Sequence, residues 1–440
     1  MLTKIRQLLA LTAVACCGWL GLTTSANAAS GQPQGCTWHQ LFDIAGLNFA
    51  YPDLASAYFT AFVPKPAAGQ KVLITGNVPD VRYFSFSSYD LSTAPYDTIN
   101  DFDIAPDNGA QTPFLGPAQV DRSIAYGAPF TLTVDYGKAP AVRAANTLYA
   151  KSPLPPGYTI MIYRTYAPLA GLGSDGGVGL PTIVYEDSNG QRVPMSQRAD
   201  CPDLLNVIIK ATGREQRYEA RDARGLPKLP QQIPGLQVFA NPPPFQVFYN
   251  LAKLFGLTPS AVQPHGEGFF TTQSTTYAVS LITRDFDDVY LVRGKAANAI
   301  DGSGGPAQLR YWSICQYDVY REAVVACTQD NATQLDADGY YTVVIADAPD
   351  RPSWATAGQG FTWLPWGRAV NSMVVVRNML PASGFAQAFQ NIQPDADPYA
   401  VSGDYFPRGA YCSAQAIKDA AGLSPAQVFA RCAADAASGG

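Results

Sequence analysis

RYFSFSSYD at residues 82–90 and RYWSICQYD at residues 310–318 are two nearly identical stretches of one 440-residue chain. They lie 228 positions apart (310 minus 82). Residue types alternate along the first stretch, and a period of two is typical of a β-strand with one buried face. One predicted face carries Tyr83, Ser85, Ser87 and Tyr89, and the other carries Phe84, Phe86 and Ser88. The repeat therefore predicts the same strand in two places.

Three further pairs of segments keep the same order in both halves of the chain. They are KVLITG at 71–76 with DVYLVRG at 288–294, PFTLTVDYGKAP at 129–140 with YYTVVIADAPDRP at 340–352, and MIYRTYAP at 161–168 with VVVRNMLP at 374–381. The last pair aligns Arg164 with Arg377 and Pro168 with Pro381. Four matched pairs in one order predict an internal duplication.

The matched segments are short, rich in Val, Ile, Thr, Tyr and Phe, and bounded by Gly, Pro, Asp and Asn, which is typical of strands. Many such strands predict a mainly β protein with two homologous β-sandwich or jelly-roll-like domains. We expect these domains at 29–200 and 263–395, joined by a helical and Pro-rich connector at 201–262. Residues 245–257 of that region are periodic enough for an amphipathic helix. Residues 396–440 are expected to form a short helical tail, with a capping box at 424–427.

Residues 1–28 have the features of a secretory signal peptide, with Lys4 and Arg6 before an apolar run and Ala26-Asn27-Ala28 as the cleavage signal. A lipoprotein anchored through Cys16 or Cys17 is the alternative. Downstream, no segment approaches 18 uninterrupted apolar residues, so no membrane span is expected. We therefore predict a secreted or periplasmic protein.

The cysteines that follow this leader agree with export, because oxidising compartments permit disulfides. A hairpin would bring Cys315 to Cys327, and Cys412 and Cys432 bracket an Ala-rich tail, which leaves one more pair. A zinc site is disfavoured, since CxxC is absent and the two histidines are far apart in sequence. The six candidates are Cys36, Cys201, Cys315, Cys327, Cys412 and Cys432.

Sequence motifs for catalysis and cofactor binding are weak. The 30 basic and 35 acidic residues form no basic stripe, so nucleic acid is not expected as a partner. The Gly-rich stretch at 170–179 precedes a strand rather than a helix, which disfavours a nucleotide site and favours a flexible loop. A loop that contacts a substrate is the alternative. Neither His39 nor His265 has a nameable triad partner, and G-x-S-x-G is absent, so catalytic residues stay unknown and no cofactor is expected. The acidic stretch at 100–109 fits turns or a calcium site.

Arginines inside apolar strands are the main candidate site residues. A buried arginine needs hydrogen-bonded or ionic partners, and Asp90 and Asp318 at the ends of the repeated stretches are natural ones. The alternative is capture of an anion or carboxylate by a guanidinium. Tryptophans could stack on a sugar or fill a core. The candidate ligand-binding residues are Arg82, Arg164, Arg310, Arg377, Trp363 and Trp366.

Over roughly residues 36–195 and 265–390, these motifs resemble secreted bacterial proteins known only as domains of unknown function. The shared features are the aromatic-Ser-x-x-x-Tyr-Asp strand and a Trp-Leu-Pro segment before an Arg-containing strand, here at 312–318, 363–365 and 374–381. The resemblance implies tandem jelly-roll-like β-domains and supplies no catalytic residues.

Taken together, the sequence favours an exported non-catalytic binding or structural protein. Its ligand is unknown, with a glycan or a small carboxylate as candidates, held by arginines and aromatic residues where the two copies meet. The alternative is a secreted hydrolase acting on a polysaccharide or an ester.

Overall fold

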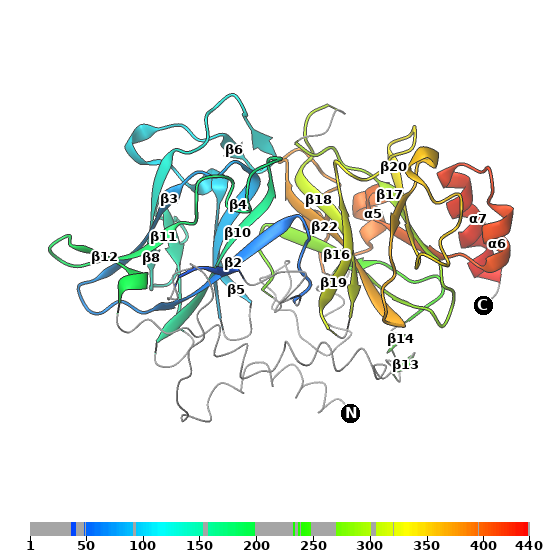
Figure 1. Ribbon diagram of the computed structural model, residues 1–440, viewed down its shortest axis with the longest axis horizontal. Helices are drawn as coiled ribbons and strands as arrows, with labels where there is room; N and C mark the ends of the chain where they lie inside the picture. The colour runs from blue at the N-terminus through cyan, green and yellow to red at the C-terminus, as the bar shows by residue number, and fades with distance from the viewer. Residues whose placement is uncertain are drawn as a thin grey trace.

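The computed structural model describes residues 37–40, 48, 50–90, 94–152, 157–198, 232–233, 236–237, 239–247, 270–300, 305–319, 321–394 and 396–438. The expected signal peptide, Cys36, Cys201, His265 and most of the connector lie outside the described residues. The described chain is mainly β and is divided below into a first half, residues 37–198, and a second half, residues 239–438 (Figure 1).

Two five-stranded sheets form the first half. The sheet nearer the second half, here the inner sheet, has the order β1 (His39–Gln40), β2 (Ser56–Pro64), β10 (Tyr158–Pro168), β4 (Val81–Tyr89), β5 (Pro95–Asn100). The outer sheet has the order β12 (Arg192–Pro194), β11 (Thr182–Glu186), β3 (Lys71–Asn77), β8 (Pro129–Asp135), β9 (Thr147–Tyr149). A separate hairpin joins β6 (Phe114–Gly116) to β7 (Gln119–Val120).

The second half has the same strand order, except that its outer sheet, given below from the opposite edge, has no described counterpart of β12. Its inner sheet runs β15 (Gln246–Val247), β16 (Thr275–Thr283), β22 (Asn371–Pro381), β18 (Leu309–Asp318), β19 (Ala323–Gln329). Its outer sheet runs β21 (Thr362–Leu364), β20 (Tyr340–Ile345), β17 (Tyr290–Lys295), β23 (Arg408–Tyr411). Each half even carries one parallel pair at the matching place, β8 with β9 and β20 with β21. The matched sequence segments therefore occupy matching strands.

Short elements connect and flank the sheets. The helices are α5 (Pro398–Ser402), α6 (Ala414–Asp419) and α7 (Pro425–Ser438). The 3-10 turns are η1 (Asp101–Asp103), η2 (Asp107–Gly109), η3 (Met195–Gln197), η4 (Ala357–Gln359), η5 (Phe389–Asn391) and η6 (Gly403–Tyr405), and β13 (Gln232–Ile233) pairs with β14 (Leu236–Gln237). Among the described residues, no helix has the length and apolar character needed to cross a membrane.

Strand β4 corrects the expectation of a single buried face, because all nine of its residues are buried. Phe84 and Phe86 lie in the core between the two sheets of the first half. Tyr83, on the opposite face, packs with Tyr166, Tyr311 and other residues at the contact with the second half. One face thus fills a sandwich and the other fills the contact between halves, so both faces of the strand are rich in aromatic residues.

The inner sheets of the two halves face each other at the centre of the molecule, and the outer sheets lie toward its two ends (Figure 1). Residues from both inner sheets share one apolar cluster, which includes Tyr83, Tyr166, Tyr311, Met379 and Leu380. Large apolar residues pack well in such a layered arrangement because each sheet buries its faces against a neighbour. The chain therefore forms four β layers whose central contact joins the halves.

The C-terminal region matches the expected helical tail in part. Helix α7 begins at Pro425, and Ser424 and Gln427 make the two hydrogen bonds of the predicted capping box, at 3.0 and 3.4 Å. Strand β23 was not expected there, and it completes the outer sheet beside β17. Within the predicted helix 245–257, residues 246–247 instead form strand β15, because Phe245 and Val247 are buried in the second core; residues 248–257 lie outside the described residues.

Candidate functional site at the contact between the halves

The repeated arginines of β4 and β18 each form an ion pair with the other half. Arg82 contacts Asp330, with 2.5 Å between Nη1 and Oδ1, and their side chains are 2% and 5% exposed. Arg310 contacts Asp101, with 2.9 Å between Nη1 and Oδ2, and both side chains are fully buried. Each half thus gives one arginine and receives one, and the two pairs are reciprocal.

Both carboxylates are held by matching backbone bonds within their own half. The Phe84 amide donates to Asp101 Oδ2 at 3.3 Å, and the Trp312 amide donates to Asp330 Oδ2 at 3.2 Å. Burial raises the pKa of Asp101 to about 6, against the opposing effect of Arg310. Burial also raises the pKa of Asp330, against the opposing effect of Arg82. These acids are positioned for ion pairing inside the protein.

The expected partner of Arg310 was Asp318, and this pairing is wrong. The two residues lie in one extended strand, eight positions apart (318 minus 310). At about 3.3 Å per residue, they stand roughly 26 Å apart, far beyond contact. Asp318 instead lies 3.6 Å from Arg321. The same geometry separates Arg82 from Asp90, so the carboxylates have to come from elsewhere.

Arg310 also binds a hairpin of the first half. Its Nε donates to the carbonyl of Pro117, in the turn between β6 and β7, at 2.6 Å, and Nη2 donates to the carbonyl of Gly116 at the end of β6. A guanidinium offers five donors in a planar fork, which suits several acceptors at once. Arg310 therefore attaches this hairpin to the second half.

The other two repeated arginines bind short arms that cross between the halves. The first arm, residues 51–55, precedes β2, and the second arm, residues 270–274, precedes β16. Arg164 donates to the carbonyl of Phe270 at 2.5 Å, and Arg377 donates to the carbonyl of Tyr51 at 2.6 Å. Tyr51 packs edge-on against Tyr317, and Phe270 packs edge-on against Tyr89. The arms are therefore exchanged reciprocally.

Asp53 in the first arm is a buried acid that the sequence analysis did not single out. Its carboxylate accepts hydrogen bonds from the hydroxyls of Tyr311, at 3.0 and 3.1 Å, and Ser313, at 2.6 Å. Arg377 Nε lies 3.9 Å from the same group. The carboxylate of the first half is thus enclosed by donors of the second.

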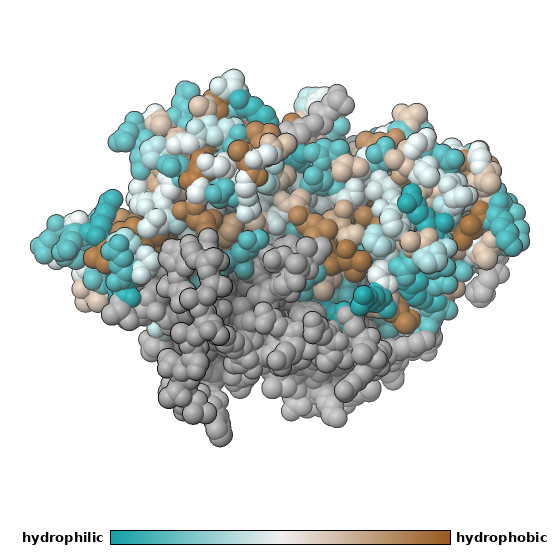
Figure 2. Space-filling model, viewed as in Figure 1, coloured by the Kyte–Doolittle hydropathy of each residue, from teal (hydrophilic) through white to brown (hydrophobic). Residues whose placement is uncertain are grey.

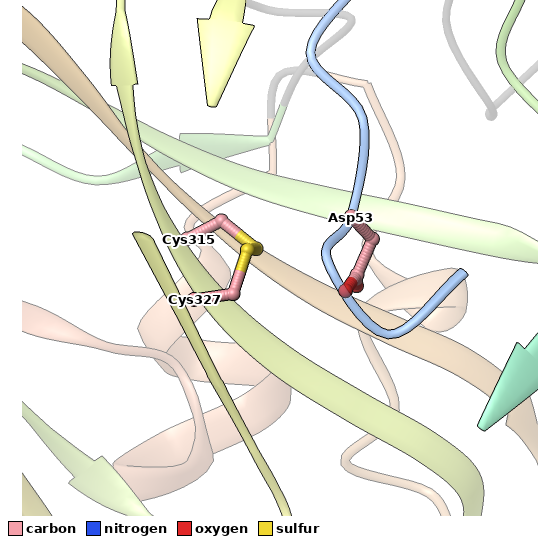
Figure 3. A group of neighbouring side chains, drawn as sticks. All are labelled: Asp53, Cys315 and Cys327. Carbon is pink, nitrogen blue, oxygen red and sulfur yellow. A yellow bond between two sulfur atoms is a disulfide. The ribbon is translucent and has the colours of Figure 1, made fainter. Parts of the chain in front are cut away.

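Asp53 also lies beside Cys315 and Cys327 (Figure 3), and these form the single group of three metal-ligating side chains among the described residues. The two cysteines are joined in a disulfide, so their sulfurs are not thiolate ligands. Asp53 already serves two hydroxyl donors, and the neighbouring Arg377 guanidinium opposes a cation. The arrangement suits structure rather than a metal.

Two predicted disulfides are confirmed. Cys315 and Cys327 lie directly opposite each other on β18 and β19, and Cys412 after β23 is bonded to Cys432 in α7. The matching positions in the first half are Ser87 and Thr98, whose hydroxyls lie 3.0 Å apart. The predicted pairing of Cys36 with Cys201 lies outside the described residues.

The two candidate tryptophans belong to the second half. Trp366 is fully buried, and its indole donates to the carbonyl of Ala369 at 3.1 Å. Trp363 is half-buried and donates to the carbonyl of Ala346 at 2.9 Å, with the Arg351 guanidinium 4.6 Å from its ring centre. The structure thus places Trp366 in the core and leaves part of Trp363 at the surface.

The weaker motifs take ordinary structural places. Asp101 in the acidic stretch pairs with Arg310 as described, and Asp107 accepts a bond from the Thr131 hydroxyl at 2.8 Å. In the Gly-rich loop between β10 and β11, Asp175 accepts bonds from the amides of Gly177 and Gly179 at 3.1 and 3.2 Å. His39 lies in edge strand β1.

A shallow hollow opens where the two halves meet. Its volume is about 320 Å³, and its open mouth is bordered by the β6–β7 hairpin of the first half and the chain before β18 in the second. Leu115 at its rim is 57% exposed. Hydrophilic and hydrophobic residues are interspersed over the described surface in Figure 2. The lining residues are Leu115, Ala118, Gln119, Val120, Ile300 and Ala307.

The chain matches no protein-family model and no curated protein. Among solved structures it is similar to an uncharacterized protein from Burkholderia cenocepacia, at 12% identity and a TM-score of 0.49, over 93% of this chain and 86% of that one. It is also similar to a protein from Vibrio parahaemolyticus, at 12% identity and a TM-score of 0.38, over 82% and 89% of the two chains. Neither likeness bears on function.

Proposed function

We propose that this chain is an exported, non-catalytic binding or structural protein whose two β-sandwich halves act as one rigid body. The observation that supports this most strongly is the pair of reciprocal ion pairs, Arg82 with Asp330 and Arg310 with Asp101. Strongly perturbed acids often mark catalytic clefts. Here they are buried against arginines between the halves, where a substrate has no access.

The two halves are proposed to descend from one duplicated sandwich. Matching strand order, matching ion pairs and matching arms support this origin. Backbone detail supports it too, because Tyr51 and Phe270 have positive φ angles of 52° and 54°, and Ala167 and Leu380 have 45° and 46°. Positive φ is uncommon for residues other than glycine, so two matching pairs favour common descent. Export is supported by the two disulfides and the leader-like residues 1–28.

Arg82, Arg164, Arg310 and Arg377 are proposed to be structural residues rather than ligand-binding ones. A ligand that contacts both halves would instead enter the hollow beside Leu115, whose lining presents both apolar side chains and polar groups. Such a lining suits a ligand with both an apolar part, which would pack on Leu115, and polar groups, which would hydrogen-bond to the rest of the lining. The proposed ligand site is therefore the hollow beside the β6–β7 hairpin and not the four arginines.

The test is a thermal unfolding screen of the full chain with glycans, small carboxylates, fatty acids, Ca²⁺ and Zn²⁺. A ligand that binds the native state raises the unfolding temperature. We expect any hit to fail with a Leu115→Asp variant and to persist with Val142→Asp, a control at a side chain that is 87% exposed. A hit that Leu115→Asp leaves unchanged would contradict the placement of the ligand.

Chromogenic glycosides and esters test the hydrolase alternative directly. The proposal predicts no turnover above buffer with any of them. Turnover that scales with protein concentration and is lost when the protein unfolds would contradict a non-catalytic role.

A further inference from the structure

Asp53 belongs to the first half, and its side chain contacts Arg377 and Ser313 of the second half. The first half contains a matching position beside Arg164. Arg377 in the central strand β22 lies opposite Tyr277 of β16 and Ser313 of β18. Arg164 in β10 lies in the same way opposite Tyr58 of β2 and Ser85 of β4. Asp53 corresponds to Thr272, at the same position of the other arm. Asp53 Oδ1 accepts from the amide two residues later at 2.9 Å, and Thr272 Oγ1 does the same at 3.3 Å. A hydroxyl therefore stands where the other half has a carboxylate.

This difference leaves Arg164 without an acidic partner among the described residues. Arg82, Arg310 and Arg377 each have a carboxylate within 4 Å. Arg164 is 1% exposed, and its partners are the hydroxyls of Ser87 and Tyr89 and the carbonyl of Phe270. A buried guanidinium without a counter-charge is costly because it has lost its hydration. The first half therefore has one buried positive charge that neutral groups alone surround.

Ser85 provides a second, independent observation that a partner is missing beside Arg164. Its side chain is fully buried, and its hydroxyl makes no hydrogen bond of good geometry among the described residues, the Tyr83 hydroxyl being its polar neighbour. The matching residue of the second half is Ser313, whose hydroxyl donates to Asp53 at 2.6 Å. Ser85 and Arg164 are directly opposite on neighbouring strands, so their side chains share one face of the sheet. A buried donor and a buried cation thus lie side by side.

We propose that a small monovalent anion, with chloride as the simplest case, binds beside Arg164, Ser85 and Thr272, at the place that matches the Asp53 carboxylate. The guanidinium would supply the charge and the Ser85 hydroxyl one hydrogen bond. A small ion is required because the side chain of Thr272 has only one non-hydrogen atom fewer than that of aspartate, and because Ser85 and Thr272 are both buried. A single charge is required because one arginine is unmatched.

The experiment follows the unfolding temperature of the full chain in sodium chloride, sodium bromide and sodium gluconate at equal ionic strength. We expect chloride and bromide to raise the unfolding temperature with saturation, as for a ligand that binds only the native state, and gluconate to leave it flat. Equal unfolding temperatures in chloride and gluconate would overturn the proposal.

Two variants separate a specific site from a general salt effect. Thr272→Asp supplies the carboxylate within the chain, so its unfolding temperature in gluconate should exceed that of the wild type and no longer respond to chloride. Ser85→Ala removes the unpaired donor, so it should weaken the chloride response and change stability in gluconate little. A chloride response that both variants keep in full would overturn the proposal, and the wild-type titration decides alone if a variant fails to fold.

Discussion

Arg310 illustrates at the scale of one residue how a buried cation is accommodated. It makes an ion pair with Asp101 and donates to the carbonyls of Gly116, Pro117 and Arg82. All of these acceptors belong to the other half. Removal of the guanidinium would therefore leave a buried carboxylate and several carbonyls without donors, which is the main cost of breaking a buried pair.

We expect Arg310→Met to lower the free energy of unfolding by about 3–5 kcal/mol, because it leaves the Asp101 charge buried and unpaired. Arg310→Met combined with Asp101→Asn should recover part of this loss, since no charge then remains. Urea denaturation of the three proteins measures both effects. The matched control is Arg192→Met, whose pair with Glu186 is exposed at the arginine end and should be worth about 0–1 kcal/mol. Equal losses in the two arginine variants would contradict the role of Arg310.

The raised pKa of Asp101 predicts how the free energy of unfolding changes with pH. Burial raises its pKa from 3.8 to about 6, so the native state holds this proton over a pH range in which the unfolded chain has lost it. Stability from this group is therefore full below about pH 4 and declines as the pH rises through 6. We expect the difference in unfolding free energy between wild type and Asp101→Asn to change in that window and to level off above it. A difference that is constant from pH 4 to pH 8 would contradict the assignment.

At the scale of elements, the sequence predicted the strands well and their surroundings less well. Strands β4 and β18 could be recognised because nine residues repeat, and the β18–β19 disulfide because a hairpin brings Cys315 to Cys327. The burial of both faces of β4 could not be recognised, because alternating aromatic and hydroxyl residues are also the pattern of a strand with one solvent-exposed face. Strand β23 was missed because four residues far from their sheet carry no periodic signal.

The Cys315–Cys327 disulfide can be replaced by the pair that the first half uses. Loss of a disulfide over a loop of this length costs about 2–4 kcal/mol. We expect Cys315→Ser with Cys327→Thr to lose less stability than Cys315→Ala with Cys327→Ala, because the hydroxyls can bond as those of Ser87 and Thr98 do. Urea midpoints under non-reducing conditions provide the comparison. The prediction fails when the two double variants have the same midpoint.

Helix α7 depends on its N-terminal cap. The Ser424 hydroxyl accepts from the amide of Gln427, and the Gln427 side chain accepts from the amide of Ser424. Replacement of a serine cap by alanine costs about 1 kcal/mol. We expect Ser424→Ala to lower the unfolding free energy by that amount, with Ser413→Ala at the cap of the shorter α6 as a comparison. An unchanged unfolding free energy for Ser424→Ala would show that the cap contributes nothing.

At the scale of the whole molecule, the partners that matter lie far apart in sequence. Asp101 is 209 residues from Arg310, and Asp330 is 248 residues from Arg82. Local reasoning chose acids at the ends of the same strands and so missed both. A signal was nevertheless present, because Asp101 and Asp330 each directly follow the strand after the repeated one. Asp53 had no such signal, since its counterpart is Thr272.

The central claim is that reciprocal ion pairs and exchanged arms make the two halves one body. Differential scanning calorimetry of the full chain with its disulfides intact tests this claim most directly. A single unfolding transition, with calorimetric and van't Hoff enthalpies in a ratio of about 1, is the predicted result. Two resolved transitions, or a calorimetric enthalpy well above the van't Hoff value, would show that the halves unfold independently and would contradict the account.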